Sequence, residues 1–115
     1  MDFENNNGLK NYHVIVTDGA YDDLDIFVAY LLLVKKNDQA AGNLLDDFNN
    51  TISQLETVAG SLKLDDDPDL AALGYHRIHL KKHRYFLLYR INGDNAVTDN
   101  MFHDLQDYKN HMWDI

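Results

Sequence analysis

The sequence contains no cysteine and a single proline, Pro68. Without cysteine the chain cannot form disulfides, thiolate metal sites or a cysteine nucleophile, which suits a reducing compartment. No segment reaches the ~20 consecutive apolar residues that a membrane-spanning helix needs. Residues 1–11 are polar and lack the basic and apolar parts of a signal peptide. We therefore expect a cytoplasmic protein with no membrane partner.

The chain is long enough to bury a core without disulfides or metals. Its 115 residues are 45% hydrophobic, which is typical of a folded globule rather than of a disordered chain. We expect one domain over residues 1–115, with residues 1–11 as a loose polar arm.

One segment departs from the acidic balance of the chain. Between Leu70 and Gly93 there is no Asp or Glu, although the whole chain has 19. This acid-free window holds five of the ten Lys and Arg and three of the six His, namely Arg77, Lys81, Lys82, Arg84, Arg90, His76, His79 and His83. The formal net charge of -9 repels polyanions at long range. A local basic face can still act at short range, because salt screens charges beyond about 8–10 Å. We therefore expect an anion site in the window, with an ordinary solvated sheet face as the alternative.

Hydrophobic periodicity predicts an α+β fold in the order β-α-α-β-β-β-α. Strands are expected at residues 12–17, 75–80, 84–91 and 96–103, and a short closing helix at residues 105–113. Two amphipathic helices are expected, one capped by Asp18 and one ended by Gly60, with the apolar stripes Ala20, Leu24, Phe27, Leu31, Val34 and Ala41, Leu45, Phe48, Ile52, Leu55, Val58. We expect the last three strands to form a small antiparallel sheet joined by the first strand, with this N-terminal helical hairpin packed on one face. Residues 65–68 should form a solvated acidic loop, and residues 92–95 a hairpin turn.

Alternation along the strands assigns side chains to the two faces of this sheet. The side chains expected under the helices are Ile78, Leu80, Leu87 and Ile91. The side chains expected on the open face are Arg77, His79, Phe86 and Arg90. Cations with an aromatic side chain among them can hold a phosphate and stack on a base. The open face is therefore a candidate RNA-binding surface.

RNA cleavage without a metal needs a base, an acid and cations that stabilise the charge on phosphorus. We expect His79 to act as the base, because imidazole titrates near neutral pH. Arg77 and Arg90 would hold the phosphate. Further RNA contacts are expected from Lys81, Lys82, Arg84 and Phe86.

The remaining histidines and the acidic run favour structural roles. We expect His76 to face the helices and His83 to be solvated in a turn. We expect His103 to act as a cap at the end of its strand. No cofactor or metal site is expected, because His76 and His79 point to opposite faces of a strand. The run at residues 65–69 also lacks the Gly and Glu of a calcium loop.

From Tyr12 to Trp113 the sequence resembles the RelE/ParE superfamily of bacterial toxin–antitoxin toxins. The carrying segments are YHVIVTDGAYDDL (from Tyr12), GYHRIHLKKHRYFLLYRI (from Gly74) and MFHDLQDYKNHMW (from Met101). They match the family's pattern of Gly-x-Arg before a strand, two tyrosines in the next strand, and a His-Gly-Arg-like corner before a last helix, here at His103. The order and spacing of these segments carry the resemblance rather than any one motif.

The resemblance implies a toxin that a cognate antitoxin neutralises, as a homodimer or a toxin–antitoxin hetero-oligomer. RelE-like members are ribosome-dependent mRNA endoribonucleases (mRNA interferases), and ParE-like members inhibit DNA gyrase without being nucleases. The resemblance to the nucleases implies that their C-terminal catalytic aromatic or His residue corresponds to His111 or Trp113, and His111 would act as the acid. An inactive, antitoxin-binding relative is a third reading. The chain departs from the nuclease pattern at two positions that are commonly Arg, because Phe86 occupies one and Leu105 or Gln106 the other.

Overall fold

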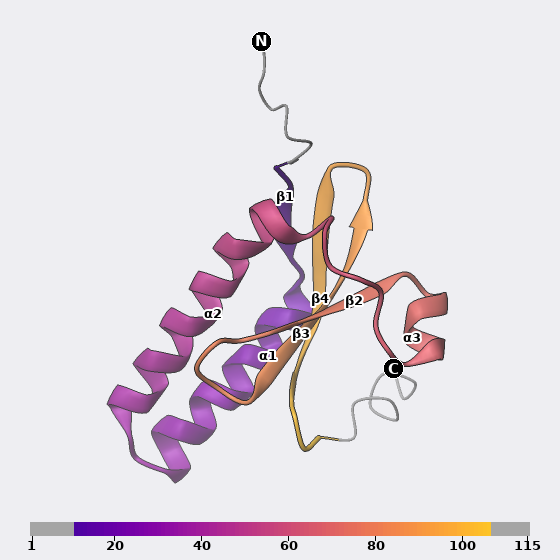
Figure 1. The fold of residues 1–115 in the computed structure, drawn as a ribbon. Helices are drawn as coiled ribbons and strands as arrows, with labels where there is room; N and C mark the ends of the chain where they lie inside the picture. Colours follow the sequence, from indigo (N-terminus) through magenta and orange to yellow (C-terminus); the bar gives the residue numbers. More distant parts are fainter. Residues whose placement is uncertain (1–10, 107–115) are drawn as a thin grey trace.

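The computed structural model describes residues 11–106, which form four strands and four helical segments. These are β1 (His13–Val16), α1 (Asp18–Ala29), the π-helix η2 (Tyr30–Val34), α2 (Asp38–Val58), α3 (Pro68–Ala72), β2 (Tyr75–His79), β3 (Tyr85–Asn92) and β4 (Asn95–His103). Figure 1 shows α1 and α2 side by side as a hairpin on one side of the molecule, and α3 on the other. The expected closing helix falls mainly on residues outside the described range.

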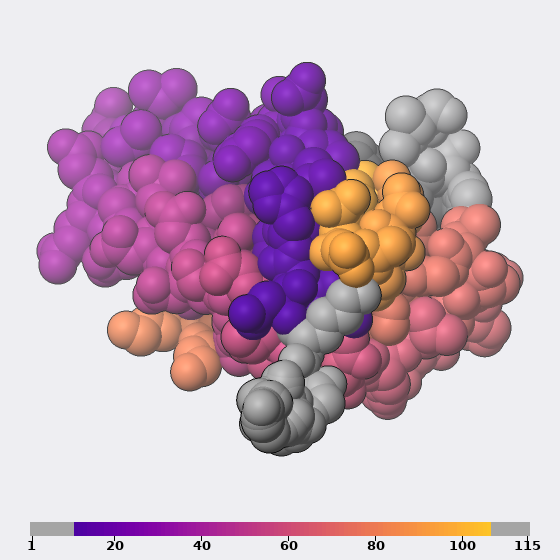
Figure 2. Space-filling model, turned by 90° about the horizontal axis from the view of Figure 1, so that it is seen from above, coloured from indigo at the N-terminus to yellow at the C-terminus, as the bar shows by residue number. Residues whose placement is uncertain are grey.

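The strands form one sheet in the order β1-β4-β3-β2. The pairs β2–β3 and β3–β4 are antiparallel, as predicted, while β1 joins β4 in parallel. Figure 2 shows β1, in indigo, directly beside the orange end of the β3–β4 hairpin. The turn of that hairpin contains Gly93 at φ 61°, a backbone conformation that glycine adopts without strain. The α+β class is therefore confirmed.

Both helices of the hairpin begin at a side-chain cap. Thr17, rather than the expected Asp18, caps α1, because its hydroxyl accepts a hydrogen bond from the Ala20 N–H at 3.2 Å. Asn37 caps α2 by accepting from the Ala40 N–H at 2.9 Å. The two predicted stripes are correct except at Val34 and Leu45, which are exposed.

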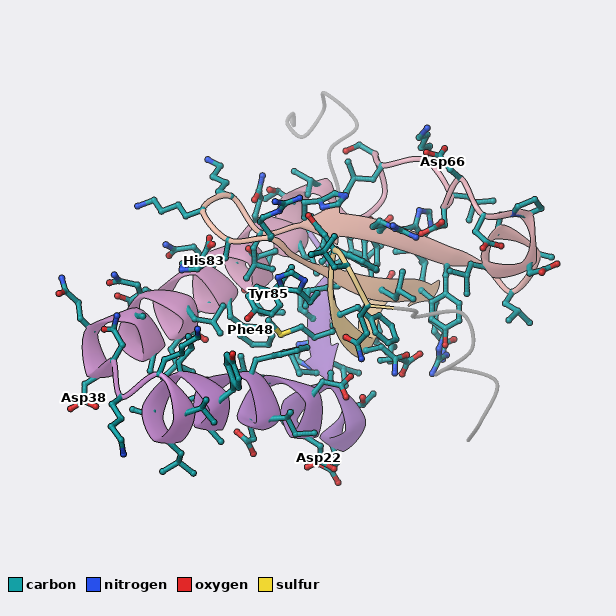
Figure 3. The ribbon with its side chains drawn as sticks, turned by 90° about the horizontal axis from the view of Figure 1, so that it is seen from below. Asp22, Asp38, Phe48, Asp66, His83 and Tyr85 are labelled. Atoms are coloured by element: carbon teal, nitrogen blue, oxygen red, sulfur yellow. The ribbon has the colours of Figure 1, made fainter. Side chains whose placement is uncertain are left out.

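The main core lies between the helical hairpin and one face of the sheet. Ile78, Leu80 and Leu87 are buried there, as predicted, and Ile91 is partly buried beside them. Figure 3 shows Phe48 between α2 and the sheet. Tyr89 is fully buried in this core, and its hydroxyl donates to the Ala59 carbonyl at 2.8 Å. Burial raises the pKa of this phenol far above its ordinary range.

The opposite face of the sheet carries a second, smaller core. Leu70 of α3 packs there with Phe86, Leu88 and Phe102, all of which are buried. The predicted exposure of Phe86 is therefore wrong. The error arose because residues 65–68 were expected to be only a loop, whereas Asp67 caps a helix that starts at Pro68.

None of the helices in the described part of the chain has the length and apolar character needed to cross a bilayer.

We expect two Gly→Ala substitutions near and within α2 to have opposite effects. A Cβ on Gly60 would overlap the Tyr12 hydroxyl and lie 3.0 Å from its ring, whereas a Cβ on Gly42 would meet nothing within 4 Å. Gly60→Ala should therefore lower the free energy of unfolding by about 1–3 kcal/mol, and Gly42→Ala should raise it by up to about 1 kcal/mol. Urea denaturation followed by circular dichroism measures both. Equal effects of the two substitutions would contradict the close approach of Tyr12.

Candidate functional site on the outer face of the sheet

The guanidinium of Arg77, on the outer face of β2, is held by a buried carboxylate. Its Nε donates to Asp65 Oδ2 at 2.8 Å and its Nη2 donates to Asp65 Oδ1 at 3.2 Å. The Asp65 side chain is only 1% exposed, and the Arg77 side chain 24%. The guanidinium also lies 4.1 Å from the centre of the Phe86 ring. A bidentate, partly desolvated pair of this kind is among the stronger ionic contacts in proteins.

The cavity beside this pair is rich in carboxylates. Its volume is about 450 Å³, and it is lined by Lys63, Leu64, Asp65, Asp66, Asp67, Arg77 and His79. Lys63 is itself paired with Asp66 at 2.6 Å. Three carboxylates therefore face two fixed cations, both of which have an acidic partner. Such a lining disfavours an anionic ligand.

Arg90, on β3, is also paired with an aspartate. Its Nε donates to Asp99 Oδ2 at 2.8 Å, and the Tyr75 hydroxyl donates to the same oxygen at 2.9 Å. Burial and the hydrogen bond to Asp99 raise the pKa of Tyr75, and that carboxylate also raises the pKa of Arg90. Both side chains are held in their charged or protonated forms.

A β-bulge directs Asp99 toward these two groups. Leu88 is opposite Asn100 and Tyr89 is opposite Thr98, which leaves Asp99 as the extra residue of β4. A bulge of this type turns a side chain away from regular alternation. Simple alternation along the strand could not therefore predict the contact with Arg90.

His79, at the end of β2, is the most open of the predicted catalytic residues in the described range. Its side chain is 59% exposed, and its Nδ1 lies 3.7 Å from Asp104 Oδ1. Arg84 is 3.9 Å from the other oxygen of the same carboxylate. Both distances exceed hydrogen-bond length, so these contacts are loose and solvated.

The turn between β2 and β3 is anchored to α2 by a buried carboxylate. Asp47, 4% exposed, accepts from the Lys81 and Lys82 N–H groups at 3.3 and 2.9 Å and from His83 Nδ1 at 2.7 Å. Figure 3 shows His83 at this turn, beside α2. Burial raises the pKa of Asp47, but these hydrogen bonds outweigh burial and hold the pKa below its ordinary value. His83 is therefore part of an anchor and not simply solvated.

The structure brings together only some of the predicted site residues. Arg77, His79 and Phe86 are neighbours, since His79 is opposite Phe86 in the sheet and its ring lies 5.7 Å from the Phe86 ring. Arg90 is opposite Tyr75, four positions from His79 and so about 13 Å away along the strand. The catalytic roles of Arg77, His79 and Arg90 and the RNA contacts of Lys81, Lys82 and Arg84 stay predictions. His111 lies outside the described residues.

The expected free cationic face is wrong, because carboxylates from outside the acid-free window reach into it. These are Asp47 from α2, Asp65 from the loop before α3, Asp99 from β4 and Asp104 after β4. Only Asp65 had a local signal, since an Asp-rich run before Pro68 favours a helix start with local hydrogen bonds. Asp47 and Asp104 come from distant parts of the chain, and Asp99, nine residues from Arg90, reaches it through the bulge in β4.

The structural roles predicted for His76 and His103 agree with the structure. His76 faces the helices and stacks on Tyr89, with ring centres 5.0 Å apart, while its Nδ1 donates to the Leu62 carbonyl at 3.0 Å. His103 accepts at Nδ1 from the Leu105 N–H at 3.1 Å at the end of β4. Both residues have structural contacts that account for their positions.

No protein-family model matches this sequence, and no curated protein matches it significantly. Solved structures do match. A chain from the structure described as the chromosomal ParDE TA system from P. aeruginosa superposes with a TM-score of 0.64 at 18% sequence identity, over 80% of this chain and 95% of that chain. At this identity the likeness shows a shared fold. The protein therefore has the α+β fold of that ParDE chain, as the sequence resemblance implied.

We expect Asp47→Asn to lower the free energy of unfolding by about 1–3 kcal/mol, because an amide cannot accept at both positions and leaves a buried N–H without a partner. The wild-type protein should also lose stability as the pH falls below about 4, because the folded-state pKa of Asp47 lies below its unfolded value. This loss should be smaller in the variant. Urea denaturation at several pH values measures both effects. Asp46→Asn, at an exposed neighbouring position, is the control, and equal losses in the two variants would contradict the anchoring role.

Proposed function

We propose that this chain is the toxin component of a toxin–antitoxin module and that it acts by binding a protein, in the manner of a ParE-like gyrase inhibitor. Two observations support the toxin assignment. The chain shares its fold with a chain from a ParDE TA system, and its sequence resembles RelE/ParE toxins over residues 12–113. Its expected partner is a cognate antitoxin with an extended segment and a helix.

We favour protein binding over RNA cleavage because the arginines of the sheet are paired with aspartates. A nuclease of this type needs cations aimed at the phosphate as charge develops. Here Arg77 and Arg90 each donate to a carboxylate at 2.8 Å. A phosphate would meet a carboxylate beside each guanidinium, and this negative charge opposes its binding. The net charge of -9 adds long-range repulsion of RNA.

A RelE-like mRNA endoribonuclease is the second candidate, and the position of His79 favours it. This imidazole is exposed, lines the cavity and lies 3.7 Å from Asp104 Oδ1. A general base must be accessible to the ribose hydroxyl that it deprotonates, and His79 meets that requirement. Arg84, on the same side, is mostly exposed and only loosely paired.

Inducible expression with and without the antitoxin gene of the native locus tests the proposal. We expect growth arrest that the antitoxin relieves, transcripts with unchanged ends, and inhibition of gyrase supercoiling by the purified protein. His79→Ala should keep this toxicity, because binding to a protein target needs no proton transfer. New transcript ends at codon positions that His79→Ala abolishes would instead support the nuclease. Harmless expression in cells without antitoxin would contradict both toxic functions.

A further inference from the structure

The turn between β2 and β3 carries two lysines, Lys81 and Lys82, that have no acidic partner within residues 11–106. Both side chains are exposed, and no hydrogen bond or ion pair in this part of the chain holds either ammonium. The backbone of the turn is nevertheless fixed, because the N–H groups of both lysines donate to Asp47 of α2 at 3.3 and 2.9 Å. Figure 1 shows this turn beside α2. Two unpaired positive charges are therefore attached to a backbone of defined position.

A polar groove lies between this turn and α2. Its larger hollow has a volume of about 550 Å³ and is lined by polar side chains that include Asn50, Ser53, Gln54, Lys81 and Lys82. A second hollow of about 360 Å³ shares Asp47, Asn50 and Lys82 with the first. We call the two hollows together the α2 groove. Both volumes are in the range of known ligand sites, roughly 300–1,000 Å³, but the polar lining suits a polar ligand.

One side of α2 supplies uncharged polar groups to the α2 groove. Asn50, Ser53 and Gln54 are exposed, and their spacings of three and four place them on the same side of the helix, with Asn43 seven positions before Asn50. From Asn43 to Gln54 the helix rises by about 16 Å, which equals about five residues of extended chain. Amide side chains both donate and accept hydrogen bonds, so they can pair with the N–H and C=O groups of a peptide.

The α2 groove lacks the features of a nucleic-acid or phosphate site. No Phe, Tyr, Trp or Arg is among the described residues that line it, so a base would have no platform for stacking. The backbone N–H groups of the turn, which could bind a phosphate, already donate to Asp47. Asp46 is exposed in the smaller hollow, so an anion is favoured only in the larger one, beside Lys81.

We propose that the α2 groove binds an acidic, extended peptide segment of a partner protein. Carboxylates of the peptide would lie at the ammoniums of Lys81 and Lys82, and its backbone would pair with Asn50, Ser53 and Gln54. Each exposed ion pair contributes only about 0.2–1 kcal/mol, so the contacts with α2 are needed as well. The groove lies on the helical side of the sheet, away from the outer face. The proposal rests on this groove and not on the toxin assignment.

Titration of the isotope-labelled protein with a hexaglutamate peptide, blocked at both ends and followed by NMR, tests the proposal. We expect saturable shifts of the signals of Lys81, Lys82, Ser53 and Gln54, with a dissociation constant on the order of 1 mM or lower at low salt. Binding should weaken several-fold as salt is raised to about 0.2 M, because exposed charges are then screened. A blocked hexaglutamine peptide should bind several-fold more weakly than hexaglutamate.

Two pairs of variants with matched charge test the location of the site. Lys81→Gln with Lys82→Gln should weaken hexaglutamate binding by about tenfold or more, since both ion pairs are lost. Lys35→Gln with Lys36→Gln removes an equally exposed lysine pair at the other end of α2 and should leave the dissociation constant unchanged. Circular dichroism checks that each variant is folded.

The second pair adds one carboxylate to α2. Asn50→Asp places it in the groove and should weaken binding several-fold, whereas Asn49→Asp places it at an exposed neighbour outside the groove and should have little effect. Equal losses within either pair of variants would show a response to net charge alone and would overturn the proposal. Absence of saturable binding, equal binding of hexaglutamine, or tighter binding of a uridine hexanucleotide in the groove would also overturn it.

Discussion

The bidentate ion pair between Asp65 and Arg77 joins the loop before α3 to the outer face of β2. Because the Asp65 side chain is 1% exposed, its charge needs a partner within the protein, and Arg77 supplies that partner. The pair holds the Asp-rich segment against the sheet. This position allows α3 to place Leu70 over Phe86 and Leu88, which closes the second core. The same contact that completes the fold on this side also pairs the Arg77 guanidinium with a carboxylate, so its charge is not free to bind an anion.

Arg90 follows the same pattern, because it is held by Asp99. Asp47 instead holds the backbone of the turn that carries Lys81 and Lys82, and the side chains of these two lysines are exposed. The window is acid-free in sequence but not in space, since four aspartates from elsewhere surround it. A fold shared with a ParDE chain is therefore combined here with a sheet face whose arginines serve the structure. The exposed apolar surface is found instead on the helical hairpin, which suits contacts with proteins.

The regular parts of the fold could be predicted because their signals are local. Alternation placed Ile78, Leu80 and Leu87 under the helices, and the sequence at residues 92–95 predicted the hairpin turn. The parallel partner of β1 has no such signal, because pairing between distant strands depends on the whole sheet. Asp99 reaches Arg90 where a bulge interrupts β4, and Val34 is exposed where η2 departs from α-helical spacing. Alternation and helical period assume regular elements, so they fail where an element is irregular.

Carboxylates neutralise the arginines on the outer face of the sheet, and direct RNA binding tests this. Fluorescence anisotropy of a labelled single-stranded RNA, titrated with the protein at low salt, should show no saturable binding up to roughly 100 µM. Asp99→Asn, which removes the charge beside Arg90, should give measurable binding that weakens as salt is added. Micromolar binding by the wild-type protein with a steep salt dependence would contradict the account, because it would show that the arginines are available to phosphate.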